Sequence, residues 1–359
     1  MDKTPNMEIT RSESSAIKGI LIILIILGHF QPYVRIPVFI RSFIYAFHVN
    51  CFLILPLFYP IKQLNNIRIK NYFARLMIPY TILYGLLFIG SCVRIMAHNQ
   101  QDTDVVSYIM KGGWTYFVGG YYPLYHTIDL RYIWFLPLMF SFSIVKDYYN
   151  SANNRTKYYL LCFGFVFYCI LWVCLKGPYC SELRETLMYM SPLSIWQAIG
   201  GLFVGVVTFS LLRIRSQFLY NNVVFTFLFV MLFFLYGIIS ADSILQLPLK
   251  FCIPIIAFAV LFGYRNILAQ SKLLRKFGEH SFEIYIVQTP ICVLSYTFLL
   301  KFIPSNSICL RTVSFVLLLA VCYLTAKLLL KIRIVKRFLF PRTWDEFMGR
   351  TILRTSQGL

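Results

Sequence analysis

The chain has 359 residues, of which 58% are hydrophobic and only 13% are charged. A soluble protein is about half apolar and about a quarter charged, so a soluble fold of this sequence would expose large apolar patches to water. The net charge is +20, but the basic residues stand between apolar runs, as they do in the loops of membrane proteins. These features exclude an ordinary soluble domain, and we expect no nucleic-acid partner.

The apolar runs, taken in chain order, predict an all-α polytopic membrane bundle of about ten transmembrane helices. A span needs about 20 mostly apolar residues. By this measure the spans lie at about residues 17–34, 38–59, 73–97, 131–147, 158–175, 192–212, 222–239, 245–263, 281–300 and 308–330. We therefore expect one membrane domain over residues 1–335 and a basic cytoplasmic tail over residues 336–359.

The loops between these spans differ in charge and length. With ten spans, 24 of the 34 Lys and Arg residues fall on one side of the membrane and 10 on the other. Cytoplasmic loops are enriched in Lys and Arg, so both termini are expected in the cytoplasm. The longest outer loop, residues 98–130, is rich in glycine and tyrosine. It is either functional or an aromatic lid without chemistry.

The ten cysteines indicate neither a disulfide framework nor a metal site. The sequence contains no Cys-x-x-Cys and no Cys/His cluster with metal-ligand spacing. Most of the cysteines lie in or beside apolar runs, where a thiol packs as a small apolar group. We therefore predict no bound metal.

His29, in the first predicted span, is the most informative ionisable residue. Such side chains are costly inside a membrane and are usually functional. Eleven helical positions separate His29 from Lys18, which is about 16 Å along a helix axis. With Lys18 at the cytoplasmic surface, His29 lies near mid-bilayer, where a neutral imidazole can act as a general base. The alternative is a histidine that only hydrogen-bonds to a neighbouring helix.

A few other polar residues accompany the spans. Arg75, at the cytoplasmic start of the third span, can bind phosphate or simply anchor the helix. Glu283 lies at the start of the ninth span, so it needs either a partner or a role. His48 and Asn50 occupy an aromatic stretch of the second span, and Trp134 belongs to an aromatic belt that opens the fourth.

The order and spacing of these motifs resemble the acyltransferase-3 family of integral membrane acyltransferases, over roughly residues 10–335. The motifs are Lys18-x10-His29 after Arg11, Phe47-His48, Arg75-Leu-Met-Ile-Pro79-Tyr80, Trp134-Phe-Leu-Pro137 and Ser281-Phe-Glu-Ile-Tyr285 before Thr289-Pro290. The resemblance implies O-acetyltransferases of the O-antigen, capsule or exopolysaccharide type. Such a protein moves an acetyl or other short acyl group from cytoplasmic acetyl-CoA to a hydroxyl of a surface polysaccharide or its lipid-linked precursor.

The resemblance also implies roles for individual residues and a location in the inner (plasma) membrane. His29 would be the catalytic base, supported by Glu283. The basic residues expected near the phosphates of acyl-CoA are Arg11, Lys18, Lys70 and Arg75. The residues expected to bind the carbohydrate acceptor are His48, Asn50 and Trp134 and, from its position in an outer loop and not from the resemblance, Asp129, for which Glu182 and Glu185 are the alternatives.

Three positions depart from the family pattern. Ser15 stands where an acid is frequent, Tyr72 stands at the first position of an Arg-x-x-Arg pair, and Gln288 replaces a histidine that is common late in the ninth-span motif. Two alternatives accompany the enzyme interpretation, and the second of them follows from these departures. One is a glycan flippase or polymerase without acyl transfer, and the other is an inactive member that serves as a partner in a glycan-synthesis complex.

Overall fold

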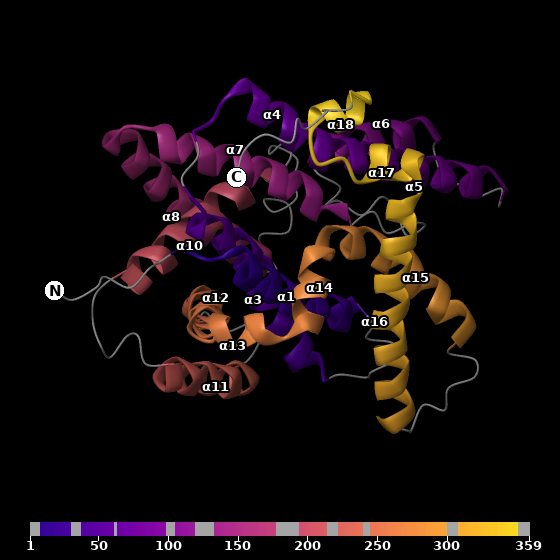
Figure 1. Ribbon diagram of the computed structural model, residues 1–359. Coiled ribbons are helices and arrows are strands. Elements are labelled where there is room, and N and C mark those ends of the chain that lie inside the picture. The colour runs from indigo at the N-terminus through magenta and orange to yellow at the C-terminus, as the bar shows by residue number, and fades with distance from the viewer. Residues whose placement is uncertain are drawn as a thin grey trace, which may run out of the picture. The chain divides into compact units, whose positions relative to one another are not determined.

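In the computed structural model the chain consists of helices and connecting segments (Figure 1). The structure describes residues 8–29, 37–60, 63–97, 105–118, 133–176, 194–213, 222–239, 245–299 and 308–350. Over these ranges there is no β-strand. The chain divides into two compact units, the first formed by residues 1–61 and 201–328 and the second by residues 62–200 and 329–359.

A helix occupies the position of each of the ten predicted spans. The helices are α1 (Arg11–His29), α3 (Val38–Ile54) with η1 (Leu55–Phe58), α4 (Asn66–Tyr72) continued by η2 (Phe73–Met77) and α5 (Ile78–Ala97), α7 (Phe135–Ser151), α8 (Asn154–Lys176), α10 (Ile195–Arg213), α11 (Asn222–Ile238), α12 (Gln246–Gly263), α15 (Ser281–Leu299) and α16 (Ile308–Lys331).

Within the described part of the chain, five helices are long and apolar enough to cross a membrane. They are Arg11–His29, Val38–Phe58, Asn66–Val93, Ile195–Arg213 and Cys309–Lys331. Two shorter apolar helices accompany them, at Asn222–Ile238 and Pro248–Gly263. The chain is therefore a helical membrane protein, while the count of ten spans and the cytoplasmic termini stay predictions.

In the first unit, α1 is the central helix and α14 (Lys272–Glu279) packs directly on its backbone. A Cβ atom added at Gly19 would lie 2.1 Å from the carbonyl oxygen of Leu274. One added at Gly278 would lie 1.6 Å from the carbonyl oxygen of Ser15. These two glycines therefore let the helices approach more closely than any side chain allows, as small residues do in membrane bundles.

The other contacts of the first unit are largely aromatic. Phe43 of α3 contacts the rings of Phe229, Phe233 and Tyr236 on α11, at centroid distances of 5.1–5.7 Å. α13 (Arg265–Gln270) and α15 also pack against α1. The N-terminal helix thus has neighbours on several sides, which explains why most of it is buried although its sequence is apolar enough to face lipid.

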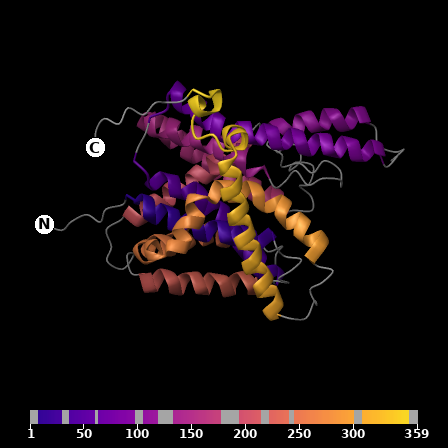
Figure 2. The ribbon, with the colours of Figure 1, turned by 45° about the vertical axis from the view of Figure 1, so that its right-hand side comes forward.

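In the second unit, α5 and α6 (Val105–Val118) lie side by side (Figure 2). Tyr84 of α5 donates a 2.7 Å hydrogen bond to the carbonyl oxygen of Gly112, and Phe88 stacks on Tyr108 at 5.7 Å. A helix therefore occupies part of the predicted outer loop 98–130. The sequence suggested a loop because this segment lies between two apolar runs. Gly112 packs against α5, where a Cβ atom would lie 2.2 Å from the Phe88 ring.

Residues 336–350 of the predicted basic tail have a defined structure as well. α17 (Arg333–Leu339) and α18 (Trp344–Met348) follow α16 in the second unit. The backbone nitrogen of Trp344 donates a 2.9 Å hydrogen bond to Asn71, and its ring faces that of Phe73. Arg337 donates a 2.7 Å hydrogen bond to the carbonyl oxygen of Phe347. This segment therefore packs on the helix that carries Arg75.

Candidate active site

His29 is the last residue of α1, and its ring is held by Gln288 of α15. The Nδ1 atom lies 3.0 Å from the Gln288 Oε1 atom. An amide oxygen only accepts hydrogen bonds, so the imidazole Nδ1–H is the donor. The Gln288 amide nitrogen donates in turn to Thr289 Oγ1 at 3.3 Å. With the proton on Nδ1, the neutral ring carries its lone pair on Nε2, as a general base requires.

Tyr45 of α3 lies beside this histidine. The two rings are 6.3 Å apart between centroids. A Cβ atom at Gly28 would come within 3.1 Å of the Tyr45 ring, so the glycine makes room for the tyrosine. Tyr45 also contacts the His48 ring at 5.2 Å, and the Arg41 guanidinium lies 5.3 Å from the Tyr45 centroid.

Two polar residues of α3 were predicted to bind the acceptor, and the side chain of each donates a hydrogen bond to a backbone carbonyl of α3 itself. His48 is buried, and its Nδ1–H donates a 2.8 Å hydrogen bond to the carbonyl oxygen of Ile44. The side-chain amide of Asn50 donates to the carbonyl oxygen of Ala46 at 3.3 Å. Each contact satisfies one polar group within α3. The role of these residues in acceptor binding stays a prediction.

Glu283 lies on α15, five residues before Gln288, which is about 7.5 Å along a helix axis. The residue is buried, with only 7% of its surface exposed. Its buried Oε2 atom has no hydrogen-bond partner among the described residues. A buried polar atom without a partner costs about 1–3 kcal/mol, so it marks a position where a ligand can complete the hydrogen bonding.

Two basic residues of α1, Lys18 and Arg11, differ in their surroundings. Lys18 places its Nζ atom 5.5 Å from the Tyr59 ring centroid, and Arg11 is exposed. Glu13 is buried and forms a 3.2 Å ion pair with Arg265. This pair was not predicted from the sequence, although the acidic residue in the first turn of α1 is visible there.

Arg275 of α14 is a second basic residue of the first unit that was not predicted from the sequence to belong to a site. Its Nε atom is buried and has no hydrogen-bond partner within the described segments. A guanidinium with an unused donor is suited to binding phosphate or carboxylate. In the sequence, Arg275 is visible only as one of several basic residues on the predicted cytoplasmic side.

The remaining predicted residues lie in the second unit. Arg75 is exposed and belongs to η2, a π-helical turn, and Lys70 is exposed on α4. π-helical turns are frequent at functional positions. Trp134 is half-buried and precedes α7. Asp129 lies outside the described residues.

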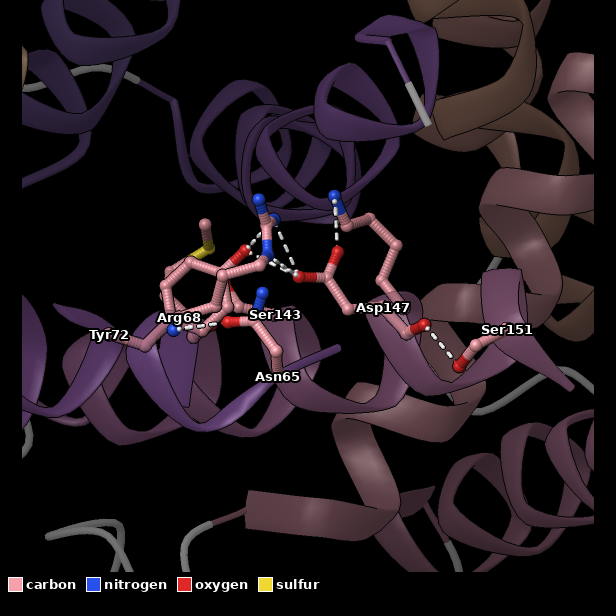
Figure 3. A network of polar contacts seen from close by, with 8 residues as sticks. Asn65, Arg68, Tyr72, Ser143, Asp147 and Ser151 are labelled. Atoms are coloured by element: carbon pink, nitrogen blue, oxygen red, sulfur yellow. Dashed lines mark hydrogen bonds and ion pairs between the residues drawn. The ribbon is translucent and has the colours of Figure 1, made fainter. Parts of the chain in front are cut away.

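A buried ionic network joins α4 to α7 in the same unit (Figure 3). Asp147 is fully buried and accepts hydrogen bonds from Arg68 Nε at 2.8 Å and from the Tyr72 hydroxyl at 2.7 Å. Lys146 Nζ lies 3.1 Å from its other carboxylate oxygen. Tyr72, a departure from the family pattern, thus helps to bind a carboxylate. Asp147 was not a candidate from the sequence, because its partners come from a distant helix.

The fold and these side chains define a helical membrane protein with a half-buried histidine whose Nδ1 atom contacts the side-chain amide of a neighbouring helix. Residues 12–327 match the model of the acyltransferase-3 family, which is described as an acyltransferase domain. The chain therefore belongs to this family of membrane acyltransferases, and the resemblance stated from the motifs is confirmed. Searches of curated proteins and of solved structures found no match.

Proposed function

We propose that the protein is a membrane O-acyltransferase. It would move an acetyl or another short acyl group from cytoplasmic acyl-CoA to a hydroxyl of a surface polysaccharide or its lipid-linked precursor. The observation that carries this proposal is the 3.0 Å contact between His29 Nδ1 and Gln288 Oε1. It places the proton on Nδ1 and the lone pair on Nε2, in a chain that belongs to an acyltransferase family.

The proposed reaction needs one base. His29 Nε2 removes the proton of the acceptor hydroxyl while that oxygen attacks the thioester carbonyl carbon. A carbon–oxygen bond forms, the carbon–sulfur bond breaks, and the imidazolium returns its proton to the leaving thiolate. Glu283 is proposed to accept a hydrogen bond from the acceptor, because its Oε2 atom has no partner within the described residues.

The donor carries phosphates, and basic residues are proposed to bind them. Arg11 and Lys18 of the first unit and Lys70 and Arg75 of the second keep this role as a proposal, and Arg275 joins them because its buried Nε lacks a partner among the described residues. If both termini are in the cytoplasm, the side of the membrane that holds 24 of the 34 Lys and Arg residues is the side where acyl-CoA is found. The inner (plasma) membrane is the location that this orientation suits.

His48, Asn50, Trp134 and Asp129 keep the proposed role of contacting the carbohydrate. The chain is also proposed to contact membrane lipids along its exposed apolar helices, such as Cys309–Lys331, most of which is not buried. No metal takes part in the proposed reaction.

The test is acetyl transfer by membranes that contain the protein. Isotope-labelled acetyl-CoA is supplied with envelope glycans and their lipid-linked precursors, and the glycan fraction is treated with mild base, which cleaves esters. We expect label in the glycan that mild base releases, and none with membranes lacking the protein. Movement or polymerisation of the lipid-linked glycan without ester-linked label would instead support the flippase or polymerase alternative.

A further inference from the structure

Gln288 lies in the interior of the first unit, and both the oxygen and the nitrogen of its side-chain amide make a polar contact. The residue is 0% exposed. Its oxygen faces His29 Nδ1 at 3.0 Å, and its nitrogen faces Thr289 Oγ1 at 3.3 Å. In this arrangement the amide oxygen points toward the imidazole, and the amide nitrogen has an acceptor in the Thr289 hydroxyl. A glutamine held in this way presents an acceptor, not a donor, to the ring.

A neutral imidazole without such a partner has a choice between two tautomers. In free histidine the form with hydrogen on Nε2 predominates, and that form has no lone pair on Nε2 to receive a proton. The hydrogen bond made by one ring nitrogen decides the state of the other. An acceptor at Nδ1 therefore selects the form in which Nε2 is basic and also holds the plane of the ring.

We propose that Gln288 is the positioning residue of the base: it fixes His29 in the Nδ1–H tautomer with Nε2 as the proton acceptor. This inference rests on the proposed function for its catalytic consequence. It concerns a residue that would otherwise count only as a departure from the family pattern. Gln288 does not touch the reacting atoms, and it acts through His29.

The tautomer can be measured directly by nitrogen NMR of the imidazole rings. The chain has only five histidines, so His29→Ala assigns the His29 signals in the purified protein. In the wild type we expect hydrogen on Nδ1. In Gln288→Leu, which removes the acceptor, we expect the population to move toward hydrogen on Nε2.

Gln246→Leu is the matched control. Gln246 is also a buried glutamine of the first unit, 3% exposed, and its amide donates to the carbonyl oxygen of Ile239 at 3.1 Å. Both variants lose a buried amide and gain an apolar side chain of similar size. Only Gln288→Leu should change the His29 tautomer, whereas a loss of stability is expected in both.

Activity supplies the second measurement. We expect Gln288→Leu to lower kcat at least about 10-fold with an unchanged KM for the acyl donor, because the base and not the donor contact is affected. Gln288→Glu keeps an acceptor at Nδ1 and should recover most of kcat at high pH. Its negative charge favours the protonated imidazole, so the acid limb of the pH–rate profile should move to higher pH.

The outcomes separate the two proposals. An unchanged tautomer in Gln288→Leu overturns the assignment of Gln288, whatever the activity. A changed tautomer in an enzyme with wild-type kcat and an unchanged pH profile also overturns it. A wild type that transfers no acyl group overturns the proposed function, and the NMR result then decides alone whether Gln288 fixes the His29 tautomer.

Discussion

Asp147 of the second unit and Glu283 of the first are both acidic side chains removed from water, with exposed fractions of 0% and 7%. Arg68 and Tyr72 donate hydrogen bonds to the Asp147 Oδ2 atom, and Lys146 forms a 3.1 Å ion pair with Oδ1, which makes no hydrogen bond among the described residues. Glu283 has a buried Oε2 atom with no partner in the described part of the chain. The first carboxylate therefore holds two helices together, and the second has capacity for a ligand.

Removal of the Asp147 carboxylate should give the largest loss of stability. Asp147→Ala leaves Arg68 and Lys146 without their counterion, and breaking a buried pair costs about 3–5 kcal/mol. Thermal unfolding of the purified protein measures the change. Glu279→Ala, at an exposed acid, is the control and should change the free energy of unfolding by less than about 0.5 kcal/mol. Equal stability of both variants would show that the network is not structural.

A methyl group at Gly278 tests the packing that positions the start of α15 and hence Glu283. In Gly278→Ala the added Cβ would lie 1.6 Å from a backbone carbonyl oxygen of α1, and we expect a loss of about 3 kcal/mol. Gly85→Ala in α5 is the control, since no atom lies within 4 Å of its Cβ position. The control should be neutral or stabilising by up to about 1 kcal/mol. A well-tolerated Gly278→Ala would rule out the close approach of α14 to α1.

Glu283→Gln should separate activity from stability. The amide removes the charge but keeps the shape, so we expect the free energy of unfolding to stay within about 1 kcal/mol of the wild type. Acyl transfer should fall at least about 10-fold, equivalent to about 1.4 kcal/mol. Unfolding and initial rates are measured on the same preparation. Full activity combined with a large loss of stability would mean that Glu283, like Asp147, stabilises the fold and does not bind a ligand.

The smallest effect is expected at the C-terminal segment. Asn71→Ala removes the acceptor of the 2.9 Å hydrogen bond from the Trp344 backbone, which is worth about 1 kcal/mol. Limited proteolysis should then cleave residues 333–350 earlier than in the wild type. Asn66→Ala, at an exposed position of α4, serves as the control. Identical cleavage of the two variants would mean that this contact does not hold the segment.

The helices were predictable from the sequence, and their mutual contacts were not. A run of about 20 apolar residues is a local property, so each of the ten predicted segments is a helix. α6 was not predicted, because its 14 residues are too short for an apolar run that could span a membrane. The close approach of Gly19 and Gly278 to neighbouring backbone depends on a second helix far along the chain, and no local pattern encodes it.

The same distinction applies to the candidate site. His29 and Glu283 were predicted because an ionisable residue in an apolar run is conspicuous by itself. Gln288 was recognised only as a departure from the family pattern, since its partner His29 is 259 residues away in the sequence. Asp147 was missed for the same reason, because Arg68 is 79 residues away. Contacts between helices are needed to distinguish a structural charge from a functional one.

The role of His29 as the base is tested most directly by acyl transfer in a variant that keeps a polar side chain but cannot accept the proton. His29→Gln is compared with His280→Gln, a control on a histidine that contacts the Tyr323 ring at 5.7 Å. Loss of a general base costs about 10²- to 10⁴-fold, so labelled ester should fall at least about 100-fold in His29→Gln and less than about twofold in the control. Wild-type transfer by His29→Gln would contradict the account.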